Sequence, residues 1–165
     1  MTLIVENGEG LADAESYISA EDASAYHEAR GNTTWATMTE QEQEEALRRA
    51  TDYMEQTYRQ NWKGVRVYTM QALSWPRNYV EFEDTYYPND EVPVEVQRAC
   101  AELAWKAAAG ELAEDLGPSV KREKVDVLEV EYDTIGPQYT RYRAVDNMLA
   151  HLLKNMGAAK KVIRV

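Results

Sequence analysis

Two histidines, His27 and His151, and a lone cysteine, Cys100, are the candidates for metal binding or for acid–base and nucleophilic chemistry outside the carboxylates. A metal site needs several ligands at defined spacing. His27 has no Cys, Asp or second His at such a spacing, and His151 belongs to a different expected helix with no matching ligand. Cys100 lies on the apolar side of an expected helix, which indicates a buried thiol. We therefore expect all three side chains to be structural.

The carboxylates do not indicate a catalytic pair. With 29 Asp and Glu residues in 165, a pair can be drawn almost anywhere. The sequence has no Gly-x-Ser-x-Gly turn, no phosphate-binding Walker loop, no His-Glu-x-x-His helix and no pair of cysteines. We therefore expect no enzyme activity, no cofactor and no metal site.

Charge and aromatic content point in opposite directions. Eleven Tyr, four Trp and one Phe could stack on the bases of single-stranded DNA, but a net charge of −11 is unusual for a protein that binds phosphates. The charge is also uneven: residues 1–117 hold nine basic and 23 acidic residues, and residues 118–165 hold nine and six. An acidic body with a mildly basic end suits a complementary neighbour, or is simply a solvated surface.

No targeting or membrane segment is expected. The N-terminus, MTLIVENGEG, lacks a basic segment, and no window approaches the roughly 20 apolar residues that span a bilayer. The length suits one domain with its own core, and a single cysteine suits a reducing compartment.

Local signals predict a mainly α fold, a small bundle of about four helices. Thr39 followed by Glu42 is a capping box and Ser19 followed by Asp22 is a second cap, so helices are expected at 19–30 and 39–60. Apolar residues at helical spacing predict two more helices, at 93–115, with Asp90 as a cap, and at 143–156.

The segment after the central helix is expected to turn back on it. Gly64 interrupts the helical pattern, and Trp62 and Trp75 bracket an extended piece from Val65 to Tyr68. Residues 77–93 are expected to form a long acidic loop, which is either a binding loop or a solvated one.

The pattern changes near the C-terminus. From Val120 to Tyr132 the apolar period falls to two, which predicts a hairpin at 121–132 with a bulge or tight turn near Val127. Residues 158–165, AAKKVIRV, form a short basic and apolar strip after the last helix. We therefore expect one domain at 1–157 and an extended C-terminal tail at 158–165.

Several stretches resemble one protein family: ALRRATDYMEQTYRQNWKGVR at 46–66 with QALSWPR at 71–77, LIVENGEGLADAESYIS at 3–19, EVPVEVQRACAELA at 91–104, and the terminal VIRV. Together they resemble the head–tail adaptors of tailed bacteriophages, also called connector or head-completion proteins, some of which are described as DnaT-like single-strand DNA-binding proteins. The resemblance implies a structural virion protein that forms a ring, most simply of twelve copies, between portal and tail. It further implies the portal and a tail-terminator or other neck or tail protein as partners, DNA passing through the ring, synthesis in the host cytoplasm and a final place in the virion neck. The alternative is a single-stranded DNA-binding replication accessory.

We expect the hairpin and the tail to be the assembly elements, because open strand edges invite pairing with another chain. The predicted interface consists of Lys121, Lys124, Val125, Val130, Tyr132, Lys160, Lys161, Val162, Ile163, Arg164 and Val165. In the alternative arrangement, the tail folds back on its own hairpin as a third strand.

Overall fold

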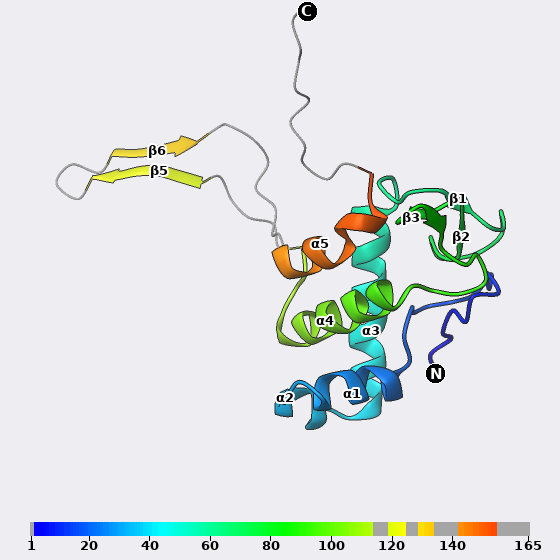
Figure 1. Ribbon diagram of the computed structural model, residues 1–165. Helices are drawn as coiled ribbons and strands as arrows, with labels where there is room; N and C mark the ends of the chain where they lie inside the picture. The colour runs from blue at the N-terminus through cyan, green and yellow to red at the C-terminus, as the bar shows by residue number, and fades with distance from the viewer. Residues whose placement is uncertain (1, 114–118, 125–128, 134–141, 155–165) are drawn as a thin grey trace, which may run out of the picture.

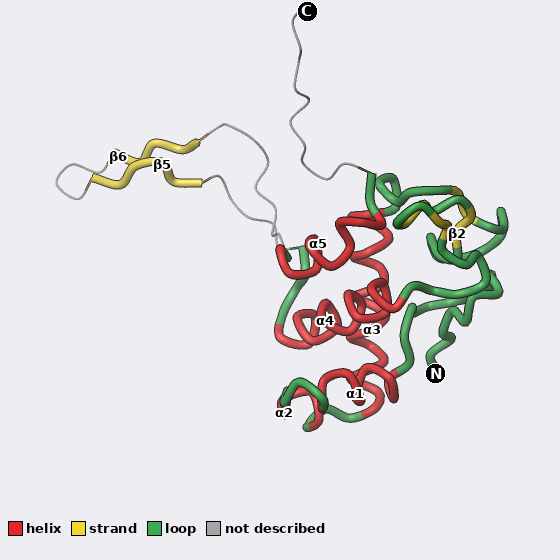
Figure 2. Tube along the Cα trace, in the orientation of Figure 1, coloured by secondary structure: helices red, strands yellow, loops and turns green. Residues whose placement is uncertain are grey.

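The computed structural model describes residues 2–113, 119–124, 129–133 and 142–154. The fold is mainly helical, which confirms the predicted fold class (Figures 1 and 2). The helices are α1 (Ala20–Glu28), α2 (Thr33–Ala36), α3 (Glu40–Tyr58), α4 (Val94–Ala109), α5 (Arg143–Leu149) and a 3-10 turn, η1 (Ala150–Leu152).

Helix α3 begins at the predicted capping box. The hydroxyl of Thr39 accepts the backbone N–H of Glu42, and the carboxylate of Glu42 accepts the backbone N–H of Thr39 at 2.8 Å. Both bonds satisfy donors that have no partner within the helix. Behind this start, the expected apolar stripe is buried, including Leu47, Ala50 and Met54.

The other helices cover α3. Helix α4 packs against α3, α5 packs against α4, and α1 contacts both α3 and α4; in Figure 1 they cross α3 one after another. Small residues such as Ala99, Ala104 and Ala107 are buried along α4, which allows the backbones to approach closely. The Tyr58 hydroxyl donates to the Asp146 carboxylate at 2.8 Å and so links α3 to α5.

Two helices end earlier than predicted. Helix α4 stops at Gly110, whose backbone is extended, rather than at 115. The last helix ends with η1 at Leu152 rather than at 156, because the chain pairs instead with the segment that follows α3: Lys63 donates its N–H to the Leu152 carbonyl, and Lys154 donates to the Asn61 carbonyl. This pairing between distant segments overrides the helical pattern.

The starts of two helices also differ from expectation. Asp90 does not cap α4, which begins after Pro93 without a side-chain cap. The short helix α2 was not predicted, and the side chain of Asn32 caps it by accepting the N–H of Trp35. Sequence patterns identify a one-turn helix poorly because it has no full period.

The N-terminal segment forms one parallel bridge, between Val5 and Ser16. The arm is nevertheless attached to the body. The Leu3 N–H donates to the Glu44 side chain of α3, and the buried Glu6 carboxylate accepts the N–H groups of Gly8, Gly10 and Leu11. Glu6 therefore organises the following turn rather than serving as an acid or base.

The region between α3 and α4 is more ordered than predicted. Strands β1 (Val65–Arg66) and β2 (Arg77–Asn78) pair antiparallel, and so do β3 (Glu81–Phe82) and β4 (Thr85–Tyr86). Trp62 and Trp75 are fully buried with ring centroids 5.7 Å apart, as expected of two anchors. We call this region, residues 61–91, the β lobe (Figure 1).

The predicted hairpin at 121–132 is present as β5 (Ser119–Lys124) and β6 (Glu129–Asp133). Its antiparallel register pairs Ser119 with Asp133 and Lys124 with Glu129, and it shifts between Val120 and Arg122. The bulge or tight turn predicted near Val127 falls outside the described residues. In Figure 1 the two strands extend to one side of the helices. Val125 and the tail at 158–165, with the predicted domain boundary, lie outside the described residues.

Candidate docking surface

Exposed apolar side chains gather in the β lobe. Among the described residues seven large hydrophobic side chains are exposed, and five of them fall between positions 65 and 86: Val65, Tyr68, Met70, Tyr79 and Tyr86. Scattered exposed apolar residues are ordinary, whereas a group of them indicates a contact surface. Two of the five, Tyr79 and Tyr86, pack against each other, and we call this ring pair the aromatic surface.

Tyr79 directly follows β2, whose last residue, Asn78, lies opposite Val65 of β1. The backbone of Tyr79 has a φ of 60°, a left-handed conformation that is uncommon for a bulky residue. At this bend Val80 enters the core with no exposed surface, while 73% of Tyr79 stays exposed.

The β3–β4 hairpin brings Tyr86 back to Tyr79. Its two turn residues, Glu83 and Asp84, have φ angles of 45° and 64°, as a tight two-residue hairpin turn requires. The rings of Tyr79 and Tyr86 then lie 6.4 Å apart at 84°, edge to face. Tyr86 is 63% exposed, so both rings offer a face or edge to a partner.

The opposite side of the hairpin is anchored to the helices. Phe82 packs against Tyr87 and His151, with ring centroids 5.2 Å and 5.3 Å away. The Tyr87 hydroxyl lies 3.3 Å from Nε2 of His151. Burial, and then the nearby Glu95 carboxylate, raise the pKa of Tyr87 above its ordinary value, so this hydroxyl stays protonated at neutral pH. The hairpin that carries Tyr86 is thus anchored to His151 of η1 through Phe82 and Tyr87.

Gly64 allows β1 to approach β2. Its φ is +67°, and a Cβ atom there would lie 2.1 Å from the carbonyl oxygen of Asn78 and 2.9 Å from a methyl group of Val80. Neither the conformation nor the contact suits a residue with a side chain. Gly64 therefore determines where Asn78, and with it Tyr79, can lie.

A buried arginine holds the same strands together. Arg77 donates hydrogen bonds to three carbonyl oxygens, those of Lys63 at 2.7 Å, Ser74 at 3.0 Å and Gly64 at 2.9 Å. Burial lowers the pKa of its guanidinium below the ordinary value, but a guanidinium stays charged in proteins. Its role is to satisfy backbone acceptors in a segment too short for regular strand pairing.

A second network ties the β lobe to α3. The Glu55 carboxylate accepts the backbone N–H of Ser74 at 3.0 Å and its hydroxyl at 2.8 Å, and it also accepts the hydroxyl of Tyr17. Burial raises the pKa of Tyr17 well above its ordinary value. These bonds explain the position of Trp75, which directly follows Ser74.

The stretch of chain that carries the two rings is acidic. No Lys or Arg occurs between Arg77 and Arg98. The exposed acidic residues of this stretch are Glu81, Glu83, Asp84, Asp90 and Glu91. The surface therefore combines apolar rings with negative charge, which favours a basic and apolar partner over a phosphate chain.

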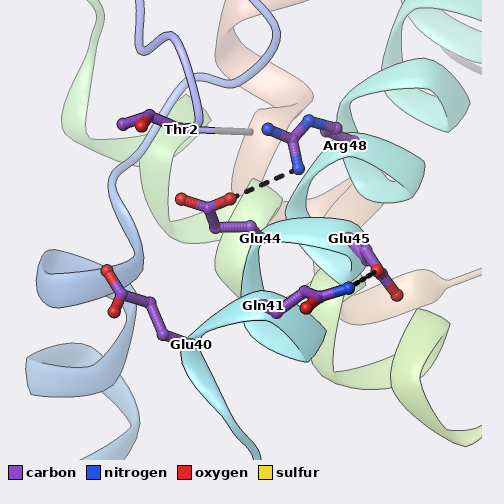
Figure 3. A pocket seen from close by; sticks show the side chains of 6 residues that line it. All are labelled: Thr2, Glu40, Gln41, Glu44, Glu45 and Arg48. Atoms are coloured by element: carbon purple, nitrogen blue, oxygen red, sulfur yellow. Dashed lines mark hydrogen bonds and ion pairs between the residues drawn. The ribbon is translucent and has the colours of Figure 1, made fainter.

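A hollow with a volume of about 520 Å³ lies at the start of α3, apart from the aromatic surface (Figure 3). It is lined by Thr2, Glu40, Gln41, Glu44, Glu45 and Arg48. Arg48 pairs with Glu15 at 3.0 Å and with Glu44 at 3.5 Å, and the Gln41 amide donates to Glu45. The charged and polar side chains that line the hollow are therefore largely bonded to one another or to Glu15. The hollow also lacks the apolar walls that are typical of ligand sites.

Cys100 and His27, which were considered for chemistry, are buried and hydrogen-bonded. Cys100 is buried, with its sulfur 3.4 Å from the Thr51 hydroxyl, and burial raises the pKa of this thiol. His27 is buried between α1 and α4, bonded to the Ala101 carbonyl. In the described ranges no group of three or more His, Cys, Asp or Glu is placed to hold a metal ion, and no helix has the length and hydropathy to cross a bilayer.

The predicted interface residues are placed only in part. Lys121, Lys124, Val130 and Tyr132 lie on the paired strands β5 and β6, as predicted for a hairpin. The six tail residues, 160–165, and Val125 fall outside the described residues. Sequence reasoning noted Tyr86 in a long loop but missed Tyr79. The alternation Tyr79-Val80-Glu81-Phe82 was the available signal, because it resembles a half-buried strand.

Over residues 1–165, the chain matches a family described as "Putative DnaT-like ssDNA binding protein". It belongs to this family. No curated protein and no solved structure matches it. The match supports the DnaT-like part of the resemblance described above. It gives no support to the head–tail adaptor part.

Proposed function

We propose that this DnaT-like family member works by docking onto other proteins, as a structural adaptor in the neck of a tailed bacteriophage. The observation that carries the proposal is the aromatic surface, with Tyr79 and Tyr86 exposed amid acidic residues. Tyrosine is enriched at protein interfaces because its ring buries a large area and its hydroxyl still forms hydrogen bonds.

Electrostatics favours a protein partner. Binding to DNA gains most of its affinity from basic residues that neutralise phosphates. The chain carries a net charge of −11, and the stretch that holds the two rings, residues 78–97, contains acidic and no basic residues. A nucleic acid would meet repulsion at this surface, whereas a basic protein segment would be attracted to it.

The resemblance seen in the sequence supports the finer form of the proposal. In that form the protein assembles as a ring, most simply of twelve copies, between the portal and a tail-terminator or other neck or tail protein. DNA passes through the ring, and no membrane takes part. The protein is made in the host cytoplasm and ends in the virion neck.

A second candidate function is the binding of single-stranded DNA as a replication accessory. The family match supports this function more directly than it supports an adaptor. In this case Tyr79 and Tyr86 stack on bases, and the basic residues in 118–165 contact the phosphates.

One pair of variants separates the two functions. Tyr79→Asn with Tyr86→Ser removes both rings, and Asn tolerates the left-handed backbone at 79. Tyr68→Ser, at a 54% exposed tyrosine outside the ring pair, is the matched control. The adaptor proposal expects that the double variant folds but forms few tailed particles. Neither the wild type nor the double variant is expected to bind a fluorescent oligonucleotide at 150 mM salt.

Oligonucleotide binding that the double variant loses, together with normal particle formation, would establish the DNA function instead. The particles are counted by negative-stain electron microscopy, and the protein is located in the purified neck by mass spectrometry. Absence of the wild-type protein from purified particles would overturn the adaptor proposal.

A further inference from the structure

The aromatic surface has no partner within the described residues, while the same chain carries a segment with the complementary chemistry. Residues 158–165 read AAKKVIRV, with Lys160, Lys161 and Arg164 spaced among apolar side chains. We infer that this tail seats on the aromatic surface of a neighbouring copy. The inference rests on the proposed docking function and names the occupant of its surface.

Charge and apolar character match on the two sides. The stretch from residue 78 to residue 97 contains six acidic residues and no basic ones, and the last six residues of the chain contain three basic residues and no acidic ones. Lysine and arginine also bind favourably over the faces of tyrosine rings. Val162, Ile163 and Val165 supply apolar side chains that the two exposed rings can cover.

The point at which the described chain ends makes the contact reachable. Lys154 donates its N–H to the carbonyl of Asn61, four residues before β1. Eleven residues, 155–165, follow it and span at most about 36–40 Å when extended. This length suffices to reach across to an adjacent subunit.

The direction of the chain favours a neighbour over the same molecule. Leu153 pairs antiparallel with Trp62, so the chain at Lys154 runs opposite to the segment that leads from Asn61 into β1. At Lys154 the described chain therefore heads back towards the end of α3 and not along the path to β1. Two different complementary surfaces on one chain produce head-to-tail contacts, which close into rings when the rotation permits.

The first test measures binding of a labelled peptide, AAKKVIRV. The receptor is a full-length variant with Lys160→Glu, Lys161→Glu and Arg164→Glu, in which the protein's own tail cannot compete. The peptide is expected to bind this tail-reversed chain and to bind at least tenfold more weakly when Tyr79→Asn and Tyr86→Ser are added. Tyr68→Ser should leave binding unchanged. No binding at millimolar peptide, or equal binding without the two rings, would overturn the inference.

The second test distinguishes a neighbour's tail from the chain's own. The tail-reversed chain keeps the aromatic surface, and the Tyr79→Asn, Tyr86→Ser chain keeps the tail. Mixed together, they are expected to form a heterodimer that grows no further, since each retains one working side, and each alone should stay monomeric in sedimentation velocity. The wild-type chain alone should associate in the same measurement; a wild type that stays monomeric while the mixture forms the heterodimer would mean that the tail seats on its own chain, which contradicts the inference.

The two proposals fail in different ways. If the double tyrosine variant blocks particle formation but the mixed variants do not associate, the surface docks a different virion protein and only the tail inference is lost. Circular dichroism and thermal melting of each variant show that it is folded. Both tyrosines are mostly exposed, so little change in melting is expected.

Discussion

Nε2 of His27, in α1, donates a hydrogen bond of 3.1 Å to the backbone carbonyl of Ala101, in the middle of α4. The other ring nitrogen, Nδ1, lies 3.3 Å from the side-chain nitrogen of Asn32 and accepts its hydrogen bond. The Asn32 oxygen is already used, because it caps α2 by accepting the N–H of Trp35. A proton on Nδ1 would therefore face another donor, so this arrangement requires the neutral imidazole.

The first prediction is that stability falls on mild acidification because of His27. Burial lowers the pKa of His27 below its ordinary value of 6.5. The unfolded chain then binds a proton more readily than the folded one, so stability present above pH 6.5 is lost as the pH falls towards the folded-state pKa. His27→Gln should flatten the decline in the free energy of unfolding between pH 7.5 and 5.5, measured with urea.

His151→Gln provides the matched control. His151 is partly exposed at the edge of the β lobe. In this variant the free energy of unfolding should decline between pH 7.5 and 5.5 as steeply as in the wild type. A flat profile for His151→Gln, with a steep one for His27→Gln, would contradict the assignment.

The second prediction concerns Gly64. Gly64→Ala should destabilise the fold by more than Gly31→Ala, although both glycines have a φ near +70°. The left-handed backbone alone costs an alanine about 1–2 kcal/mol. A Cβ at Gly31 meets nothing within 4 Å, whereas at Gly64 it meets the Asn78 carbonyl at 2.1 Å. Equal losses in chemical denaturation would show that the backbone at Asn78 moves aside freely.

The third prediction is that Arg77→Met destabilises the protein by about 3 kcal/mol, the order expected when charge-assisted hydrogen bonds to buried carbonyls are lost. Three carbonyl oxygens lose their donor at once. Arg66→Met is the control, since half-buried Arg66 bonds one carbonyl, that of Gln71. Tryptophan fluorescence and urea melts report both effects. A loss for Arg77→Met no larger than that for Arg66→Met would exclude the proposed role in the strands.

The fourth prediction addresses the start of the central helix. Thr39→Ala removes the hydroxyl that caps α3 and should cost about 1 kcal/mol. Thr33→Ala, at an exposed threonine in α2 with no capping role, should change stability by less than about 0.5 kcal/mol. Thermal melts of the two single variants are compared directly. Similar melting temperatures for both would mean that α3 is held by packing alone.

Much of the helical framework could be predicted from local sequence signals. The starts of α1 and α3 were correct because Ser19 and Thr39 act on backbone groups within three residues. The hairpin β5–β6 was predicted correctly because the alternation of apolar and charged residues is visible in a single short run. The burial of Trp62 and Trp75 followed from their size and from their place beside Gly64 and Pro76.

The aromatic surface was beyond such reasoning. One ring lies in the link between β2 and β3 and the other in β4, and Tyr79 is exposed because Val80 next to it enters the core. The stretch 77–93 reads as a loop because its strands are two residues long and its turn has Glu83 and Asp84 where Asn and Gly are usual. The alternation that predicts a strand cannot be recognised in two residues.

By itself the sequence determined the helical class, the positions at which α1 and α3 begin, the hairpin, and the contrast between an acidic body and a basic tail. Each depends on residues close together in the chain or on composition alone. Tertiary structure alone decided where the last helix ends, because Lys63 and Leu152 must meet before their hydrogen bond can compete with another helical turn. It also decided which tyrosines face the solvent, since exposure depends on what the rest of the chain covers.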